Sequence, residues 1–392
     1  METKDDSLAH FFQNMNLFQG LYPYIASCTQ ENMPTFEKML PQLYSPLHFF
    51  FAGTGRSGLV AYRGVDNFYY GLQKEAFFLE NGETPGSIRK GDMFIMVSGS
   101  GGTTTSVNDT KYAKDQGMII NLLTFNRKSP IAEITDNLLK IPGQESNQQA
   151  KEYAKRLGND GEPVMVMGTA SEFGALSSID ALSYGLAHSN NFQDFYTNYT
   201  RLLYDQLTYA GNVNRKLQEA ESQQLITSMT SSLAYGKGNV STVAAGFSGQ
   251  LCHMFTIRLG HAVHTRDGRK IVYLTSKNFP QYSRRIDKDT QLVAVSGSGE
   301  TKFTIDVAET HIKTGCKVFA VTSNENSTLA KLVGKENTLV LPTSKEFMLK
   351  DNYSIRDFDS VALMPLDCIA METMRLIGKS EDAAKQEHNR FR

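Results

Sequence analysis

One short motif occurs twice in this chain, and its repetition sets the period of the whole sequence. The stretch Met96 to Thr105 reads Met-Val-Ser-Gly-Ser-Gly-Gly-Thr-Thr-Thr, and Val295 to Thr301 reads Val-Ser-Gly-Ser-Gly-Glu-Thr. An apolar run precedes each copy, which predicts a buried strand that ends at the loop. In both copies an asparagine follows the first serine of the motif by 28 residues. Because the surroundings repeat with the motif, a simple turn does not account for the pattern.

Other residues recur at nearly the same offset. Gly55 and Gly246 are 191 residues apart, and Asp180 and Asp367 are 187 apart. The sequence therefore predicts two copies of one unit, with small insertions and deletions between them. A chain of 392 residues is long enough for two domains with cores of their own. We place domain 1 at residues 1–195 and domain 2 at residues 196–392, each starting with helices of its own.

Apolar runs alternate with helical patterns in both halves. Leu47 to Ala52 and Ile119 to Phe125 are typical of buried strands, whereas Ser171 to His188 has the length and spacing of a helix. Such alternation predicts an α/β protein with two parallel sheets, each doubly wound and flanked by helices in a flavodoxin-like order. Within residues 7–43 we expect one or two helices with breaks near Gly20 and Pro34. Residues 126–129 are expected to cap a further helix.

The repeated loops carry the composition of an anion site. A loop between a strand and a helix presents its N–H groups at the helix N-terminus, where the helix dipole favours negative charge. Hydroxyls add uncharged donors, and glycines let a ligand approach the backbone. Ser/Gly runs also serve as plain turns. The candidate phosphate contacts are Ser98, Ser100 and Thr103 in the first half, and Ser296, Ser298 and Thr301 in the second.

Composition excludes several other classes of function. The net charge is −1, from 40 basic and 41 acidic residues, so neither nucleic acid nor a membrane is an expected partner. The four cysteines lie far apart without metal-ligand spacing, which predicts reduced thiols and no metal site. Since neither a signal pattern nor an apolar run of ~20 residues is present, we expect a soluble cytoplasmic protein.

A second Gly-rich loop, Gly53-Thr-Gly-Arg-Ser-Gly58, opens the first domain. It departs from the dinucleotide fingerprint and has no acidic partner downstream, so no nucleotide cofactor is expected. Thr54 and Ser57 could contact a sugar or its phosphate, or could cap the following helix. Arg56 is either a substrate contact or an interface salt-bridge residue.

Five motifs together resemble the SIS (sugar isomerase) domain family, and within it the 6-phospho-3-hexuloisomerases. They fall in the order and approximate spacing of that family: Gly53 to Gly58, Val97 to Gly101, Thr124-x-Asn126-x-x-Ser129-Pro130, Gly168-Thr-x-x-Glu172 and His388-Asn389. The resemblance covers nearly the whole chain, once in each half.

The resemblance implies a function and an assembly. In the family, the Ser/Thr loop holds a sugar phosphate, a glutamate shuttles a proton, and a C-terminal histidine reaches in from a neighbouring subunit. Here these roles fall to the loop at Ser98, to Glu172 and to His388. A single carboxylate that takes and returns a proton needs neither a metal nor an organic cofactor. Since single-unit relatives assemble as tetramers, a homodimer of this double chain is expected.

The two halves differ where a site should be equivalent. Asp359 takes the place of Glu172 in the second half, and Phe247 takes the place of Arg56. The spacing that leads from Asp367 to His388 leads to no histidine in the first half. This predicts one working composite site, with Glu172 and His388, and one altered site.

Other interpretations remain open. His388 lies close to the end of the chain and could be a solvated tail residue. An amino-sugar-phosphate isomerase or deglycase is a rival, although the chain lacks the His-Gly-Pro element of that branch. The rival outside enzymes is a non-catalytic phosphosugar-binding regulator.

Overall fold

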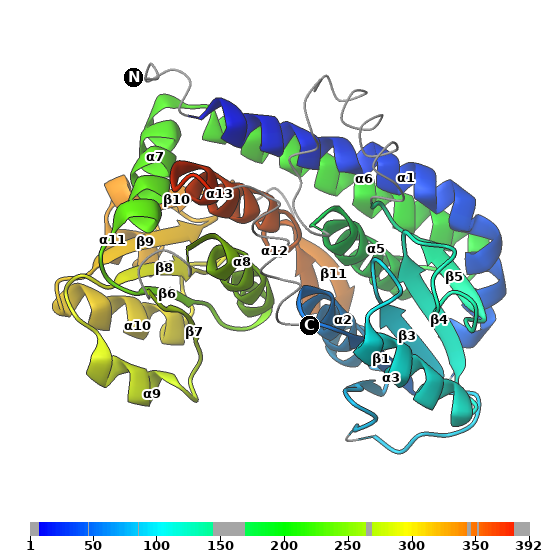
Figure 1. Cartoon of the computed structure of the whole chain (residues 1–392). Helices are drawn as coiled ribbons and strands as arrows, with labels where there is room; N and C mark the ends of the chain where they lie inside the picture. The colour runs from blue at the N-terminus through cyan, green and yellow to red at the C-terminus, as the bar shows by residue number, and fades with distance from the viewer. Residues whose placement is uncertain are drawn as a thin grey trace. The chain divides into compact units, whose positions relative to one another are not determined.

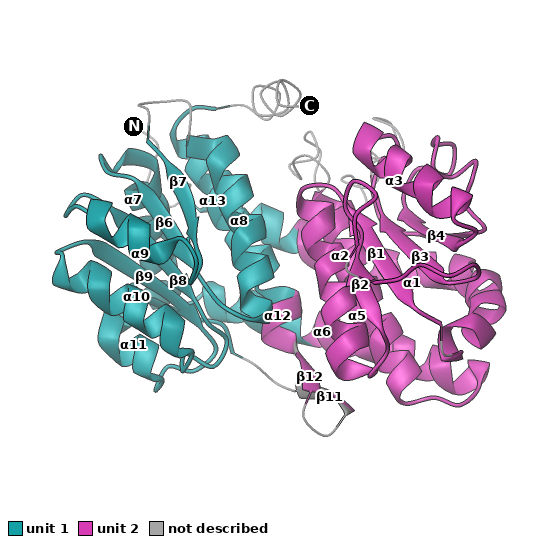
Figure 2. Cartoon of the chain, turned by 90° about the horizontal axis from the view of Figure 1, so that it is seen from below, with its two compact units in different colours: residues 1–16, 209–344, 361–392 teal, residues 17–208, 345–360 magenta. Residues whose placement is uncertain are grey.

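The computed structural model describes residues 8–45, 47–84, 86–143, 169–263, 269–342, 346–350 and 353–379. These residues form two compact units, which have different colours in Figure 2. Unit 1 draws on Met1–Asn16, Tyr209–Ser344 and Val361–Arg392, and unit 2 on Leu17–Thr208 and Lys345–Ser360. Neither unit is one continuous stretch of chain. The domain boundary proposed near residue 195 stays a prediction.

Unit 2 is built on a five-stranded parallel sheet in the order β2-β1-β3-β4-β5 (Figure 1). Its strands are β1 Phe49–Gly53, β2 Ala76–Phe78, β3 Met93–Val97, β4 Ile119–Thr124 and β5 Asn137–Lys140. Its helices are α2 Arg56–Asp66, the π-helix η2 Asn67–Gly71, α3 Thr104–Asp115 and α5 Thr169–Ala187. The antiparallel hairpin of β11 Glu346–Lys350 and β12 Tyr353–Arg356 also belongs to unit 2, as does most of α12 Asp357–Val361.

The central strands of unit 2 are apolar on both faces because helices cover both. Alternate side chains of β1 and β3, such as Phe50 and Phe94, join one buried cluster with Ala113 of α3. Their neighbours point the other way, and the ring of Phe51 packs where a side chain on Gly64 of α2 would have to stand. This two-sided burial is the arrangement expected for a parallel sheet.

Unit 1 repeats this topology. Its parallel sheet has the order β10-β9-β8-β6-β7, which is the order of unit 2 when the strands are renumbered from β6. The strands are β6 Val240–Val243, β7 Ile271–Leu274, β8 Gln291–Val295, β9 Lys317–Thr322 and β10 Thr338–Val340. The helices are α7 Ala220–Tyr235, α8 Phe247–Val263, α9 Phe279–Tyr282, η3 Ser283–Arg285, α10 Lys302–Lys313, α11 Thr328–Val333, η4 Lys335–Asn337 and α13 Leu363–Leu376. The predicted α/β class with two doubly wound halves is confirmed.

A stacked pair of rings occurs at the same place in both halves. In unit 2 the rings of Tyr62 and Phe78 stack with centroids 3.9 Å apart and an interplanar angle of 8°. In unit 1 His253 and Tyr273 stack at 4.7 Å and 9°. Each pair joins the first helix after the first strand to the edge strand beside it. The two halves therefore agree in side-chain packing as well as in strand order.

The prediction of breaks near Gly20 and Pro34 is wrong. Helix α1 Ala9–Tyr44 is continuous and holds Pro23, Pro34 and Pro41. A proline inside a helix costs about 3 kcal/mol. Against this, α1 buries a long apolar face, and each fully buried side chain contributes about 1.5–3 kcal/mol. That face consists of Phe11, Met15, Phe18, Leu21, Tyr22, Ile25, Phe36, Met39 and Leu43. Packing therefore outweighs local propensity. A second long helix, α6 Phe192–Leu217, also contributes residues to both units.

The helix expected after Ser129 does not form either, since residues 126–136 make turns. The hydroxyl of Ser129 accepts from the Ala132 N–H at 3.2 Å, as a helix cap would. The chain is then drawn back to β4, because the Thr135 hydroxyl and the Asp136 N–H both donate to the carbonyl of Ile120. The chain therefore enters β5 after too few residues for a helix to form.

Candidate functional site

The loop between β3 and α3 is held in shape by the last residue of β4 and by residues that follow it. Thr124 donates its hydroxyl to the Gly99 carbonyl at 2.7 Å, and the Asn126 amide donates to the Ser100 carbonyl at 3.1 Å. Gly101 has φ +62°, and a Cβ there would collide with the hydroxyl of Ser129. The Thr-x-Asn-x-x-Ser motif thus braces the Ser-Gly-Ser-Gly loop, which explains why the two recur at fixed spacing.

The braced loop of unit 2 keeps hydroxyls available for a ligand. Within the described part of the chain, the side chains of Ser98 and Thr103 make no hydrogen bond; Thr103 stands at the N-cap of α3 without capping it. Ser100 is exposed and accepts a long bond from the Gly102 N–H at 3.4 Å. These groups lie at the N-terminal end of a 12-residue helix. Donors in this position favour an anion.

A buried ion pair stands beside this loop. Arg56, in the first turn of α2, places its Nε 3.0 Å from Oε2 of Glu172, in the first turn of α5. Arg56 is 6% exposed and Glu172 is 8% exposed. Burial strengthens such a pair and makes either charge costly to leave alone. Both predicted residues are therefore brought together in one place.

Two short contacts bring the loops after β1 and β3 close to the Arg56–Glu172 pair. The Thr54 hydroxyl lies 3.0 Å from the hydroxyl of Ser106, in the first turn of α3. A Cβ on Gly99 would lie 2.5 Å from the hydroxyl of Ser171, the residue before Glu172. The half-buried Ser57 follows Arg56 in α2. The carboxyl ends of β1 and β3 and the N-terminus of α5 thus converge, as ligand sites in open α/β sheets do.

The matching loop of unit 1 uses its hydroxyls internally. Ser296 and Thr301 bring their hydroxyl oxygens within 3.0 Å of each other, and the Ser298 hydroxyl accepts from the Glu300 N–H. The Glu300 carboxylate accepts from both the hydroxyl and the N–H of Thr328, and these hydrogen bonds lower the pKa of Glu300. An anion at this loop would have to replace the bond between Ser296 and Thr301.

Three other residues that the sequence singled out have different outcomes. His388 lies outside the described residues, so its pairing with Glu172 stays a prediction. Asp359, the second-half counterpart of Glu172, is buried within unit 2, where its charge acts on Arg63 and Tyr353. Phe247 begins α8 at the place that Arg56 has in α2.

The described residues contain neither a metal-binding group of side chains nor a membrane-spanning helix. Among them, no three His, Cys, Asp or Glu side chains are grouped so as to hold a metal ion. No helix in the same ranges combines the length and apolar character that a membrane crossing needs.

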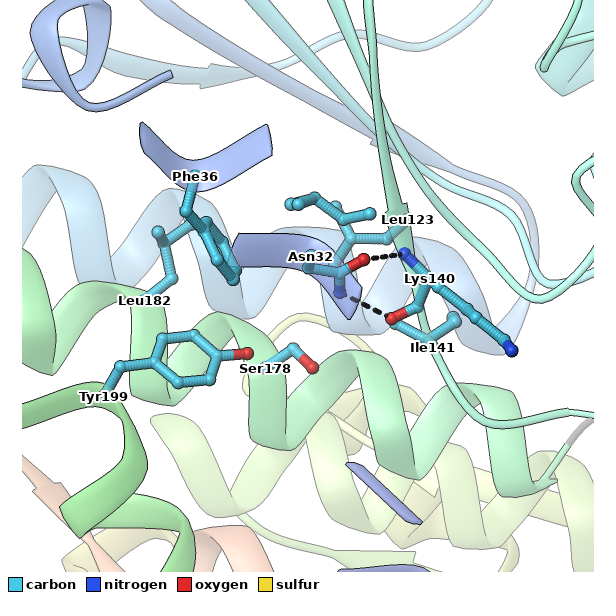
Figure 3. A pocket seen from close by; sticks show the side chains of 9 residues that line it. Asn32, Phe36, Leu123, Lys140, Ile141, Ser178, Leu182 and Tyr199 are labelled. Atoms are coloured by element: carbon cyan, nitrogen blue, oxygen red, sulfur yellow. Dashed lines mark hydrogen bonds between the residues drawn. The ribbon is translucent and has the colours of Figure 1, made fainter. Parts of the chain in front are cut away.

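A small hollow lies away from this site, between α1, β5, α5 and α6 (Figure 3). The Asn32 amide donates to the Lys140 carbonyl and accepts from its N–H, both at 2.8 Å, so Asn32 covers the open edge of β5. Burial raises the pKa of Tyr199 to about 12. The Lys140 ammonium pairs with Glu31 at 3.3 Å. These polar groups stabilise the fold, and we assign no ligand to the hollow.

Comparison with known proteins agrees with this geometry. Residues 42–154 match the family model of the SIS domain. This stretch has the sequence of a SIS domain. A 3-hexulose-6-phosphate isomerase from Methylomonas aminofaciens is 34% identical over 125 residues, which cover 31% of this chain and 66% of that protein. The matched stretch is thus a little under two thirds of that relative. An enzyme of the same name from Mycobacterium gastri is 29% identical over 154 residues, 38% of this chain and 76% of that protein.

A structural neighbour extends the likeness to both halves. The tagatose-6-phosphate ketose/aldose isomerase from Escherichia coli superposes with a TM-score of 0.66 at 11% identity, covering 98% of this chain and 97% of that one. At this identity the likeness shows the fold alone. It supports two halves with a SIS-like fold.

Proposed function

We propose that this protein is a phosphosugar aldose/ketose-type isomerase that works through an enediol. The observation that carries the proposal is the buried pair of Arg56 and Glu172 beside a Ser/Thr loop whose hydroxyls stay available. That combination supplies an anion-binding loop and a carboxylate close to it. The named hexulose-phosphate isomerases among its relatives support a phosphorylated ketose as substrate.

In the proposed complex the phosphate binds at the loop. Ser98, Ser100 and Thr103 donate their hydroxyls, and the N–H groups at the start of α3 add to them. A phosphate ester carries a charge of about −1.5 to −2 at neutral pH. Arg56 supplies a positive charge near the loop, which partly offsets the negative charges of the Glu172 carboxylate and the incoming anion.

In the proposed reaction Glu172 shuttles the proton. Its carboxylate takes a proton from one carbon of the sugar, which leaves an enediolate that becomes the enediol when its oxygen is protonated. Glu172 then returns its proton to the neighbouring carbon as the oxygen of the former hydroxyl loses one. Arg56 would stabilise the oxygen that gains negative charge in between. His388 is proposed to open the sugar ring or to move protons between the oxygens, since a histidine titrates near neutral pH. The composite site of Glu172 and His388 is part of this proposal.

The proposal is tested with hexose and pentose phosphates in D₂O, with 6-phospho-3-hexulose first. An isomerase that shuttles a carbon-bound proton should form the isomeric sugar and introduce deuterium at the reacting carbon. A phosphosugar-binding regulator should bind the ligand without exchange. An amino-sugar enzyme should act on 6-phosphoglucosamine and leave the hexulose untouched. Either of these results would replace the proposed function.

Ser98→Ala should weaken substrate binding at the loop. A hydrogen bond to a charged group contributes about 1.5–3 kcal/mol, so the Michaelis constant should rise about 10- to 100-fold. Ser296→Ala is the matched control, because Ser296 already bonds to Thr301. Steady-state kinetics of both variants check this. If Ser98→Ala keeps the wild-type Michaelis constant, the phosphate does not bind at this loop.

We also propose that the chain forms a homodimer, which would assemble four SIS units. Sedimentation velocity at micromolar concentration should give a mass near twice that of the 43.6 kDa chain. A sedimenting monomer over the whole concentration range would contradict the proposed assembly without touching the proposed reaction.

A further inference from the structure

The segment 345–360 comes from the second half of the sequence and packs within unit 2. Its hairpin of β11 and β12 covers the π-helix η2. The backbone of Gly71 is so close that a Cβ there would collide with Leu349 and with the ring of Tyr353. The ring of Tyr70 stacks on Tyr353 at 6.2 Å. A π-helical turn is uncommon and often marks a functional region.

Beneath this contact lies a buried polar cluster centred on Asp180 of α5. Its Oδ1 accepts from Arg63 Nε and from the Asn67 amide, both at 2.8 Å. Its Oδ2 accepts from the hydroxyl of Ser360 at 2.7 Å and from Arg63 Nη2 at 3.4 Å. The Tyr353 hydroxyl donates to the Asn67 amide oxygen at 2.9 Å. We call these five residues the Asp180 cluster.

The cluster is buried and electrostatically tight. Asp180, Asn67 and Ser360 have no exposed surface, and Arg63 is 3% exposed. Burial alone would lower the pKa of Arg63, but the Asp180 carboxylate outweighs burial and raises that pKa, so the guanidinium stays charged. For Tyr353, burial raises the pKa, so its hydroxyl keeps its proton and stays a hydrogen-bond donor.

The cluster joins the same two helices that carry the candidate site. Arg56 and Arg63 are two turns apart on α2, and Glu172 and Asp180 are about two turns apart on α5. Two arginine–carboxylate pairs therefore link α2 to α5, one at the candidate site and one about two turns further along both helices.

Both helices bury several small residues beside these charged pairs. Gly58, Ala61 and Gly64 are buried on α2. On α5 the small buried residues are Ser171, Gly174, Ala175, Ser177, Ala181, Ser183 and Gly185. The glycines of α2 face the sheet, since a Cβ on Gly64 would collide with the ring of Phe51 and one on Gly58 with the Gly53 carbonyl. Buried polar pairs are best attested as devices that fix register.

We propose that Ser360 is a positioning residue for the Arg56–Glu172 pair. Its hydroxyl holds Asp180, Asp180 fixes the setting of α5 against α2, and that setting places Glu172 opposite Arg56. The second half of the chain thereby supplies part of the support for the site in the first half. The inference deepens the proposed function and rests on it.

Kinetics of Ser360→Ala test the inference. We expect kcat for phosphosugar isomerisation to fall about tenfold, because small errors in the position of a catalytic group lower rates steeply. The Michaelis constant should stay within about twofold, since the phosphate loop lies outside the cluster. Partial unfolding would also lower the apparent kcat without changing the Michaelis constant, so the folded fraction of the variant is measured by circular dichroism and kcat is expressed per folded enzyme.

Ser183→Ala is the matched control. Ser183 is also fully buried on α5, but its hydroxyl donates to the Ile179 carbonyl of its own helix at 2.8 Å. Both variants remove one buried hydroxyl, so similar losses of thermal stability are expected. Only Ser360→Ala should lose kcat. Equal kcat values for the two variants would overturn the positioning role.

A second measurement separates this inference from the proposed function. If the wild-type chain isomerises no phosphosugar, the proposed function fails, and amide hydrogen exchange then tests the positioning role alone. Exchange in the second turn of α5, Phe173 to Leu176, should be about tenfold faster in Ser360→Ala than in Ser183→Ala. Equal exchange in both variants would overturn the inference.

Discussion

Glu172→Gln is expected to lower kcat for isomerisation by about 10²- to 10⁴-fold, the usual loss when a general base is removed. The amide keeps the shape of the carboxylate but cannot accept the proton from carbon. The phosphate loop is unchanged, so the dissociation constant of the phosphosugar should stay within about tenfold. Calorimetry for binding and a coupled assay for turnover check the two parts separately.

The stability of this variant must be measured as well. Glu172 is the countercharge of buried Arg56, and an arginine left without it is costly. A fall in the melting temperature is therefore expected, and activity should be assayed well below it.

Asp359→Asn makes the same chemical change at the second-half counterpart. Asp359 lies near Arg63 and Tyr353, so the change should affect stability more than turnover. If Asp359→Asn lowers kcat as much as Glu172→Gln, the two halves do not differ in the proposed way. If neither variant loses activity while phosphosugars still bind, the base lies elsewhere. If the wild-type chain binds phosphosugars without turnover, the regulator interpretation replaces the enzyme.

The sheet topology could be predicted because the signal for it is local. Each strand is an apolar run next to a turn, and the loops at Ser98 and Ser296 mark the same step in both halves. The two incorrect predictions, a break in α1 and a helix after Ser129, have a common cause in tertiary packing. Pro34 favours a break in α1, but the buried face of that helix outweighs it. Ser129 starts a helical turn, but the bonds of Thr135 to β4 and β5 end it.

The candidate site was predictable as a set of residues and not as an arrangement. Arg56 and Glu172 stood out in the sequence, yet their pairing depends on how two helices 116 residues apart meet. Asp180 served only as a marker of the repeat. Its partner Ser360 is 180 residues away, and no local pattern indicates that segment 345–360 packs in unit 2.

Asp180→Ala should have the largest effect on stability. The substitution removes the carboxylate that pairs with buried Arg63 and that accepts hydrogen bonds from the Asn67 amide and the Ser360 hydroxyl. Removing one partner of a buried ion pair costs about 3–5 kcal/mol. Urea unfolding followed by circular dichroism should show this loss as a large shift of the transition to lower urea.

Lys302→Ala provides the comparison, because Lys302 forms an exposed ion pair with Asp306 one turn along α10. Such pairs contribute about 0.3–0.5 kcal/mol, so its transition should scarcely move. Each variant breaks one ion pair, but of the two pairs only that of Asp180 is buried, and Asp180 also accepts hydrogen bonds from three residues at once. Equal shifts would mean that Arg63 finds water or another acceptor when Asp180 is removed. In that case the cluster would not fix the setting of α5, and the support that Ser360 is proposed to give would be lost with it.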